Sequence, residues 1–203
     1  MLAIIGGSGF KDFEHKDVIF IQRHGNNIPP HKINHQENIT KLKQKGVKQI
    51  IAICSVGSLK LEIQVGAIVI PDDYINFNTS TIFNNKAIHT VPSLDTNLRN
   101  KIMDSAKKLN IETINQGIYF QTKGPRFETK AEINLIKNYA DILGMTMASE
   151  ATIANELGLK YAAICSIDNY ANGISNTPLS FDEITKTQKT NKTKTLNILN
   201  ELI

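Results

Sequence analysis

The chain has 203 residues, 41% of them hydrophobic and 21% charged, which is the composition of an ordinary globular protein with one sizeable core. Its apolar runs are far too short to cross a bilayer, and its first residues lead into glycines without a basic region, so the sequence predicts neither a membrane span nor a signal peptide. The net charge is +4, and much of the excess lies in residues 186–194, whose lysines and threonines resemble the solvated face of a final helix. The lysines are otherwise scattered and no nucleic-acid-recognition motif occurs, so we expect small anions as partners, and neither nucleic acid nor membranes.

Apolar, strand-like runs alternate with helical patterns along the whole chain, and no linker interrupts them. This order predicts a single α/β domain over residues 1–203, with a central sheet flanked by helices. Cys54 and Cys165 each fall inside a strand-like run, which favours buried free thiols in a reduced, cytoplasmic compartment. Strands are expected at residues 2–5, 18–22, 49–54, 67–70, 114–120, 141–145 and 161–167.

Helices are predicted from their capping signals and from the glycine or asparagine that stops them. Two lie at residues 34–45, capped by Asn34, and at residues 95–109. A third follows Thr129, which can form a capping box with Glu132. The fourth starts at Ser149 or Glu150 and ends at Gly158, and the fifth opens on a capping box of Ser180 and Glu183.

Small polar residues follow directly after several predicted strands, where ligands bind in sheets of this kind. Ser8 lies in a glycine-rich turn after the first strand, Arg23 and His24 follow the second, and Ser55 and Thr146 follow later ones. Together these groups predict a phosphate-sized anion site. Alternatives stay open: structural glycines in the turn, a surface ion pair for Arg23, a satisfied polar role for His24 and a helix cap for Thr146.

The segment 124–129 sets Phe127 beside Glu128 at the start of the third helix. A phenyl face stacks on a flat heterocycle, and an ionised carboxylate accepts hydrogen bonds from ring N–H and amino groups. The pair therefore predicts a site for a flat base, in particular a 6-oxopurine. The alternative is a hydrophobic staple at Phe127 and a solvated charge at Glu128.

These motifs occur in a recognisable order along nearly the whole chain. They are IIGGSGF at residues 4–10, RHG at 23–25, PHKINHQENI at 30–39, CSVGSL at 54–59, GPRFET at 124–129, MT at 145–146 and NY at 169–170. The chain thereby resembles the purine nucleoside phosphorylase and methylthioadenosine phosphorylase family. The resemblance implies a phosphorylase fold, with a central mixed, twisted sheet that is partly barrel-like, and a homo-oligomer, either a trimer or a hexamer. It also implies phosphorolysis of a purine nucleoside with inorganic phosphate as co-substrate and with no metal or organic cofactor.

The resemblance also implies roles for single residues. Met145 matches the residue that packs under the ribose, and Phe127 matches the aromatic residue of the base pocket. Phe181 and Ile184 match apolar residues of the 5′ pocket in methylthio-nucleoside members. The residues that match phosphate ligands are Ser8, Arg23, His24, Ser55 and Thr146.

Glu128 and Asn169 decide which purine we expect. The resemblance pairs this combination with 6-oxopurines, because Glu128 accepts from N1–H while the Asn169 amide can donate to O6 and accept from a protonated N7. Members that act on 6-aminopurines have Asp in place of Asn169 and a second Asp where this chain has Ala171. Asp168 is adjacent, so a shift of register by one residue reverses the assignment.

We therefore expect phosphorolysis of inosine, guanosine or 5′-methylthioinosine to free base and (5-methylthio)ribose 1-phosphate, with Asn169, Glu128 and His24 as catalytic residues. The alternatives are a methylthioadenosine phosphorylase and a non-catalytic nucleoside-binding member of the family. The chain is shorter than the family pattern between Gly9 and Arg23 and over residues 76–94, so part of the barrel or of an intersubunit surface is expected to be missing.

Overall fold

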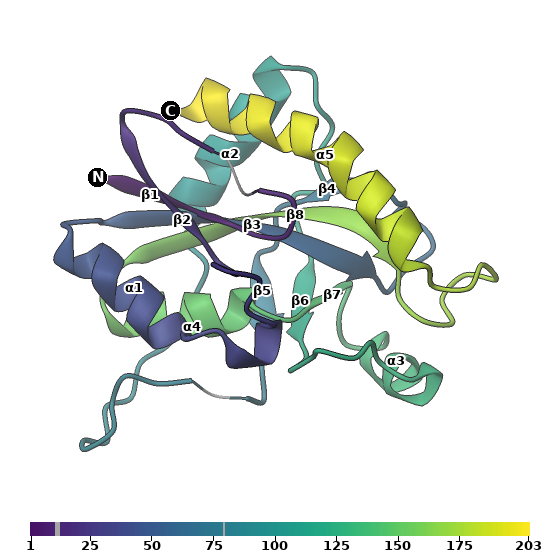
Figure 1. Cartoon of the computed structure of the whole chain (residues 1–203), viewed down its shortest axis with the longest axis horizontal. Helices are drawn as coiled ribbons and strands as arrows, with labels where there is room; N and C mark the ends of the chain where they lie inside the picture. Colours follow the sequence, from purple (N-terminus) through teal and green to yellow (C-terminus); the bar gives the residue numbers. More distant parts are fainter. Residues whose placement is uncertain (11–12, 79) are drawn as a thin grey trace.

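The computed structural model covers the whole chain and describes all residues except 11, 12 and 79, together with every side chain of its helices and strands except that of Glu183. A mixed sheet forms the centre (Figure 1). Its strands in the described residues are β1 (Leu2–Gly6), β2 (Val18–Gln22), β3 (Gln49–Ser58), β4 (Ile68–Val69), β5 (Asp73–Ile75), β6 (Ile118–Gln121), β7 (Ile142–Gly144) and β8 (Lys160–Tyr170). The helices are α1 (His35–Gln44), α2 (Thr96–Lys108), α3 (Lys130–Ile136), α4 (Met147–Glu156) and α5 (Phe181–Leu202), with a 3-10 turn at Pro30–Lys32.

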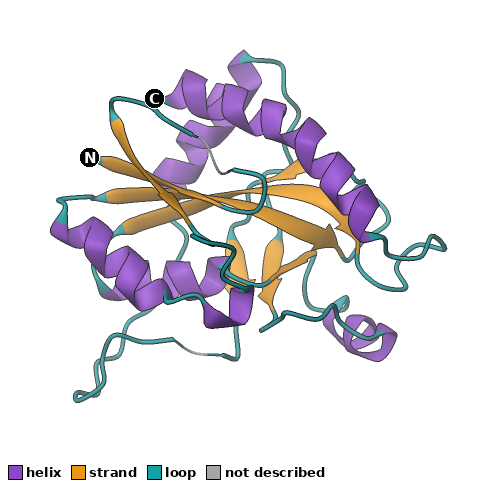
Figure 2. Ribbon diagram, in the orientation of Figure 1, coloured by secondary structure: helices purple, strands orange, loops and turns teal. Residues whose placement is uncertain are grey.

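Strand β3 is the central strand of the sheet and pairs with three other strands. Its first half pairs in parallel with β1, its last two residues pair antiparallel with β7, and its whole length pairs in parallel with β8. Strand β2 adds to β1, β6 and β5 continue from β7, and β4 pairs antiparallel with β8. Because β1 and β7 occupy successive parts of the same edge of β3, the sheet divides there into two arms (Figure 2). The expected mixed sheet is thereby confirmed.

Helices cover both faces of the sheet (Figure 1). Helices α2 and α5 pack against each other and β8 on one face, while α1 and α4 pack together on the other. No helix within the described residues is long and apolar enough to cross a membrane. The expected α/β class with helices on both faces is confirmed.

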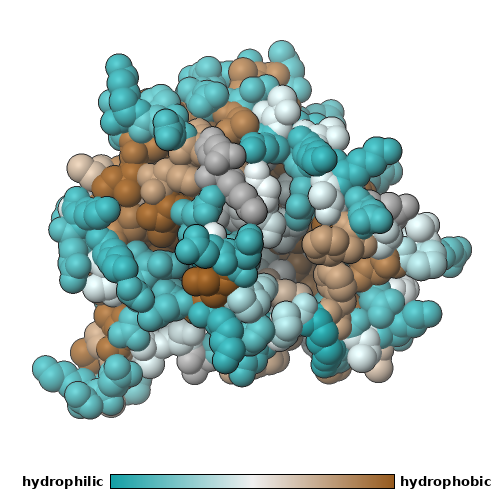
Figure 3. Space-filling view, viewed as in Figure 1, coloured by the Kyte–Doolittle hydropathy of each residue, from teal (hydrophilic) through white to brown (hydrophobic). Residues whose placement is uncertain are grey.

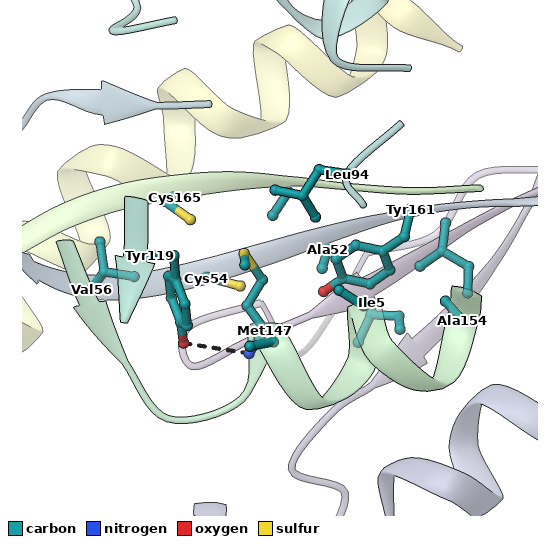
Figure 4. Packing of buried hydrophobic residues seen from close by; sticks show 14 of the residues in the cluster. Ile5, Ala52, Cys54, Val56, Leu94, Tyr119, Met147, Ala154, Tyr161 and Cys165 are labelled. Atoms are coloured by element: carbon teal, nitrogen blue, oxygen red, sulfur yellow. Dashed lines mark hydrogen bonds between the residues drawn. The ribbon is translucent and has the colours of Figure 1, made fainter. Parts of the chain in front are cut away.

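Strands β3 and β8 are continuous apolar runs in the sequence because they lie in the core of the protein. Nearly every residue of both strands is buried, since helices lie on both sides of them. Cys54 and Cys165 stand opposite each other in the parallel register, and both are buried free thiols, as the strand-like runs predicted (Figure 4). Tyr119 is fully buried in the same cluster, with its hydroxyl directed to the start of α4.

Most helix boundaries follow the local capping signals. The Asn34 side chain accepts from the Glu37 N–H, the Asp95 side chain from the Leu98 N–H, and Thr129 and Glu132 form the predicted capping box. Helix α5 begins at Phe181, next to Ser180, while the Glu183 side chain of the expected capping box lies outside the described part.

Some elements differ from the prediction. Helix α4 begins at Met147, two residues before Ser149. The strand expected at residues 114–120 pairs as a ladder only from Ile118, since Gly117 takes a φ of +151°. Ile114 makes one isolated bridge to Val69. Strand β5 was not predicted, because it is only three residues long and begins on an exposed aspartate.

Residues 80–94 form an arm without helix or strand that projects from the body (Figure 1), and its outer part is mostly hydrophilic (Figure 3). Both ends of the arm are tied to α4. The Ile82 N–H donates to Glu156 at 2.7 Å, and the Asn155 amide donates to the Ser93 carbonyl at 2.9 Å. The segment that resembles a shortened family region is therefore an anchored loop.

Candidate active site

A cleft of about 510 Å³ opens where β1, β2, β3, β7 and β8 end. Its wall also contains residues of the segment before α3 and of the first two turns of α5. Each site residue expected from the sequence lines it: Ser8, Arg23, His24, Ser55, Phe127, Glu128, Met145, Thr146, Asn169, Phe181 and Ile184. Residues that are far apart in the sequence, from Ser8 to Ile184, therefore line one cavity. Most of them lie at or near the ends of strands, where ligands bind in sheets of this kind. Their chemical roles remain predictions.

The glycine-rich turn after β1 is packed too tightly for side chains at its start. A Cβ on Gly7 would lie 2.5 Å from the Ile53 carbonyl oxygen and 2.6 Å from Arg23 Nη1. Gly7 is therefore required for close packing of the turn against β3 and the guanidinium. Ser8 is exposed to the cleft, and its hydroxyl has no partner in the described part of the chain, so it is available to a ligand.

Arg23 is buried and makes a two-point ion pair with Glu150. Nε donates to Oε1 at 2.6 Å and Nη2 to Oε2 at 2.9 Å, while Nη1 donates to the Ile53 carbonyl at 2.8 Å. Nη2 also contacts Cys54 Sγ at 3.6 Å. The surface ion pair considered from the sequence is therefore wrong. The donor fork is also mostly occupied, and within the described residues one N–H of Nη1 is left without a partner.

Glu150 is a residue of the site that sequence reasoning missed. It was read as a helix start, yet it lies inside α4 with an exposed fraction of 1%. Burial opposes its ionisation, but the charge of Arg23, helped by nearby His35, lowers the pKa of Glu150 to about 2. The Tyr161 hydroxyl donates to Oε2 at 2.8 Å. A carboxylate among the small and apolar residues of the first two turns of α4 was the available signal, because such a charge needs a buried partner.

His24 is half-buried, and one of its ring nitrogens is bonded within the protein. Nδ1 lies 2.9 Å from the Ile28 carbonyl oxygen, which can only accept, so Nδ1 carries the proton. Burial lowers the pKa of His24 from its ordinary 6.5, against the hydrogen bond to Ile28, and the charge of Arg23 lowers it further. The neutral ring then leaves Nε2 as an acceptor for a protonated phosphate oxygen.

Ser55 is held from two sides. Its Oγ accepts from Gln188 Nε2 of α5 at 2.9 Å, and it also hydrogen-bonds Asp168. Gln188 lines the cleft, and its Oε1 lies 3.9 Å from where a Cβ on Gly9 would be. Gln188 therefore lies near both loops expected to bind phosphate. Sequence reasoning treated this part of α5 as a solvated face and did not find it.

Thr146 occupies the cap position of α4, but its side chain makes no capping hydrogen bond. The backbone N–H groups of Thr146 and Met147 instead donate to the Tyr119 hydroxyl, at 3.2 and 3.4 Å. Figure 4 shows the bond from Met147. The cap alternative for the Thr146 hydroxyl is therefore wrong, and this buried hydroxyl lines the cleft.

Met145 packs closely against Gly124. A Cβ on Gly124 would lie 2.5 Å from Met145 Sδ, and Gly124 has a φ of +66°. Both the space and the backbone conformation require glycine there. The segment 124–129 is thereby packed directly against the residue expected under the ribose.

Phe127 and Glu128 behave differently from a staple and a solvated charge. Phe127 remains 43% exposed and lines the cleft. Glu128 is only 6% exposed, and its Oε1 accepts from the Thr122 hydroxyl at 2.6 Å. The solvated-charge alternative is therefore wrong, and an aromatic face and a buried carboxylate border the same cavity.

A β-bulge decides between Asp168 and Asn169. In the pairing of β3 with β8, Val56 stands opposite Ile167 but the next residue, Gly57, stands opposite Asn169, so Asp168 is skipped. The Asp168 carboxylate accepts from Asn191 on α5 at 2.8 Å and from Ser166 at 3.2 Å, and only Asn169 lines the cleft. Burial raises the pKa of Asp168, against these hydrogen bonds.

The α5 side of the cleft carries two apolar residues followed by a polar one. Phe181 is 72% exposed at the start of the helix, and Ile184 is buried one turn further. Gln188 follows on the same helical face. The predicted 5′ pocket therefore has two apolar residues and an amide beyond them.

The arrangement divides the cleft chemically. Hydroxyls, one guanidinium N–H and a neutral imidazole lie around the β1, β2 and β3 ends, where an oxyanion fits. A phenyl ring, a carboxylate and a carboxamide from Phe127, Glu128 and Asn169 form the other part, where a flat heterocycle with N–H groups fits. Within the described residues, no group of three or more His, Cys, Asp or Glu side chains could hold a metal ion.

Comparisons with known proteins show the family of the chain. The family model described as Phosphorylase superfamily matches residues 8–203. The chain is 47% identical over 191 residues to the "Probable 6-oxopurine nucleoside phosphorylase" of Archaeoglobus fulgidus, covering 92% of this chain and 79% of that protein. It is 36% identical over 232 aligned positions to the "Probable S-methyl-5'-thioinosine phosphorylase" of Methanocaldococcus jannaschii, covering 100% of this chain and 92% of that protein. That alignment is longer than this chain, so the relative carries insertions.

The chain is also 35% identical over 200 residues to the S-methyl-5'-thioadenosine phosphorylase of Pyrococcus horikoshii, covering 95% of this chain and 77% of that protein. Among solved structures, the methylthioadenosine phosphorylase of Schistosoma mansoni in complex with adenine superposes with a TM-score of 0.88 at 22% identity. The match covers 99% of this chain and 90% of that one, and it shows that the two share a fold.

Proposed function

The chain belongs to the phosphorylase superfamily, and on that premise we propose that it catalyses phosphorolysis of a 6-oxopurine nucleoside to free base and ribose 1-phosphate, or 5-methylthioribose 1-phosphate. Inosine, guanosine and 5′-methylthioinosine are the candidate substrates. Inorganic phosphate is the co-substrate, and the proposal includes no metal or organic cofactor.

One observation carries the choice of a 6-oxopurine. Glu128 and Asn169 border the same cleft beside Phe127, while Asp168 is turned toward α5 by the bulge. A carboxylate can accept from the N1–H of a 6-oxopurine, whereas the N1 of a 6-aminopurine offers it no proton. One N–H of the Asn169 amide donates to the Tyr170 carbonyl at 2.9 Å, and the other has no partner among the described residues and can donate to O6. A mismatched base leaves these groups unpaired, which costs binding free energy.

Phosphate binds at the opposite end in this proposal. The Ser8 and Thr146 hydroxyls and the free N–H of Arg23 donate to its oxygens, and Ser55 borders it. The charge of Arg23 is balanced by Glu150, so hydrogen-bond geometry rather than a bare cation holds the anion. Nε2 of neutral His24 accepts a hydrogen bond from a P–OH group and so orients the phosphate.

The reaction then follows from orientation. A phosphate oxygen attacks C1′ while the C1′–N9 bond stretches, and the transition state resembles an oxocarbenium ion above Met145. The bonding electrons leave with the purine, which gains a proton at N7, where Asn169 Oδ1 accepts it as a hydrogen bond. Glu128 holds the opposite edge. Overall, the base takes up the proton that hydrogen phosphate gives up, so charge and protons balance.

The 5′ substituent is the finer part of the proposal. Phe181 and Ile184 offer an apolar wall that suits a methylthio group. A methylthioadenosine phosphorylase is the second candidate, favoured by the similarity to the Pyrococcus horikoshii protein. Against it stand Ala171 and the bulge, because neither cleft position expected to carry aspartate in 6-aminopurine enzymes does so here.

We also propose that the protein acts as a homo-oligomer, a trimer or hexamer, in the cytoplasm. Exposed apolar residues support an assembly, among them Leu135 and Tyr139 around the end of α3, at 67% and 65% exposed. The two buried free thiols support a reducing compartment. Size-exclusion chromatography with light scattering tests the assembly.

The deciding experiment measures purine release from inosine, 5′-methylthioinosine and methylthioadenosine, each with and without phosphate. We expect phosphate-dependent release of hypoxanthine and little release of adenine. Adenine as the main product would favour the second candidate. Ligand-induced stabilisation without any release would instead indicate a non-catalytic nucleoside-binding protein.

A variant then tests the role of Asn169. Asn169→Ala should lower turnover far more than it weakens phosphate binding, because the amide acts on the leaving base. The exposed Asn138, which follows α3 and whose amide donates to the Asn134 carbonyl of that helix, provides the matched control Asn138→Ala. Equal loss of turnover and of phosphate binding in Asn169→Ala would refute the assignment.

A further inference from the structure

The carboxylate of Glu128 is held in one orientation by a residue outside the cleft. The Thr122 hydroxyl donates to Oε1 at 2.6 Å, which is a short charge-assisted hydrogen bond. Thr122 is itself fixed, since its backbone N–H donates to the Gly144 carbonyl at 2.9 Å. The backbone of Glu128 is fixed from the other side, where the Asn172 amide donates to its carbonyl at 3.0 Å. Side chain and main chain of Glu128 therefore have little freedom to turn.

The nearest cation in sequence does not compete for this carboxylate. Arg126 donates from Nη1 and Nη2 to the two carboxylate oxygens of Glu132, both at 2.8 Å. In the part of the chain that the structure describes, Oε2 of Glu128 has no partner. Glu128 thus enters the cleft with one oxygen already bonded and one oxygen free.

The two common 6-oxopurines differ at the edge that meets this carboxylate. Hypoxanthine presents one donor, N1–H. Guanine presents two, N1–H and the 2-amino group, which together match both oxygens of a carboxylate. A guanine amino group that reached Oε1 would have to share that oxygen with the Thr122 hydroxyl or displace it. The free Oε2, in contrast, matches the single donor of hypoxanthine.

From this geometry we propose that Thr122 is a positioning residue, acting through Glu128, that makes the site prefer hypoxanthine nucleosides over guanine nucleosides. The inference rests on the proposed 6-oxopurine phosphorolysis and assigns its base preference. Thr122 touches no substrate, and its effect is on which oxygens of Glu128 are open to the base.

The test replaces the hydroxyl while keeping the shape of the side chain. Thr122→Val removes the donor and frees Oε1, so the ratio of kcat/KM for guanosine to kcat/KM for inosine should rise about tenfold, the effect of one hydrogen bond to a charged group. Thr122→Ser keeps the donor and should keep the wild-type ratio. Thr113→Val is the matched control, because the Thr113 hydroxyl bonds only Asn115 at the surface.

Two results would overturn the inference. One is a wild-type enzyme that prefers guanosine. The other is a Thr122→Val variant whose two activities fall by the same factor, since a merely structural role lowers both substrates alike. If Thr122→Val does not fold, Thr122→Ala is measured against the same criterion.

Equilibrium binding separates this inference from the proposed function. Dissociation constants of hypoxanthine and guanine, measured by calorimetry with phosphate present, should show the same tenfold change in preference in Thr122→Val. If the wild type releases no base from either nucleoside, the proposed catalysis fails, while the binding ratio still decides the role of Thr122. If catalysis is present and both ratios stay within twofold of wild type, only the role of Thr122 is refuted.

Discussion

Replacing Glu150 by glutamine tests the buried ion pair that supports the candidate phosphate site. The variant removes the charge but keeps the shape, and it leaves the Arg23 guanidinium buried without a counter-charge. The pKa of Glu150 falls from its ordinary 4.5 to about 2 in the folded protein. Because one pKa unit corresponds to about 1.4 kcal/mol, the ionised carboxylate contributes about 3 kcal/mol to the free energy of unfolding at pH 7.

Buried ion pairs in other proteins give a similar loss of unfolding free energy, since removing one partner costs about 3–5 kcal/mol. For a protein of this length, a loss of about 3 kcal/mol lowers Tm by about 10 °C. Phosphate should restore more stability to Glu150→Gln than to the wild type, because an anion in the cleft supplies the missing counter-charge to Arg23.

The stabilisation by Glu150 should decrease as the pH falls. A carboxyl whose pKa is lowered on folding stabilises the protein above its unfolded pKa and loses that contribution as the pH falls toward the folded value. The stability difference between wild type and Glu150→Gln should therefore be full above pH 5 and fall to less than half of it by about pH 3.

Urea unfolding of both proteins between pH 7 and pH 3 measures this difference. Glu132→Gln is the matched control, because Glu132 also makes a two-point pair with an arginine and its pKa is also lowered to about 2, but both side chains are exposed. Solvent screens that pair, so the control should change stability little. Equal unfolding free energies of wild type and Glu150→Gln at pH 7 would refute the reasoning, as would a difference that does not change with pH.

Three further predictions concern the cleft. The imidazole of His24 should titrate by NMR with a midpoint below 6.5, because burial lowers its pKa, and phosphate should raise the midpoint; no response to phosphate would place the anion elsewhere. Gln188→Leu should raise KM for phosphate severalfold and change KM for the nucleoside less, since Gln188 holds Ser55; the reverse pattern would assign Gln188 to the 5′ end of the sugar. Gly124→Ala should lower the unfolding free energy by about 1–3 kcal/mol and raise KM for the nucleoside, because the new Cβ meets Met145; wild-type stability in chemical denaturation would contradict the strain at this position.

Local sequence signals were sufficient for most elements of the fold. The capping box of Thr129 and Glu132 places α3 correctly, because its bonds join residues three apart. Strand β2 has the predicted bounds, since its apolar run is short and clearly ended. Strand β5 and the true start of the strand at Ile118 were missed, because both depend on pairing between β5 and β6 across more than 40 residues of chain.

For the candidate site, too, some features could be predicted from local sequence and others could not. The sequence alone determined which chemical groups are present and where they stand relative to the strands: a glycine-rich turn with Ser8, a hydroxyl at Thr146, and an aromatic ring beside a carboxylate at Phe127 and Glu128. These follow from short motifs, whose turns and helix starts are fixed by neighbouring residues.

Only the tertiary structure decided how Arg23 is bonded and whether Asn169 or Asp168 faces the cleft. Arg23 binds Glu150, 127 positions away in the sequence, so most of its donor fork is not open to a ligand. Asn169 rather than Asp168 faces the cleft, because a bulge against β3 shifts the register by one residue. Both facts depend on which distant segments pack together and in what register, and a local pattern of side chains does not encode either.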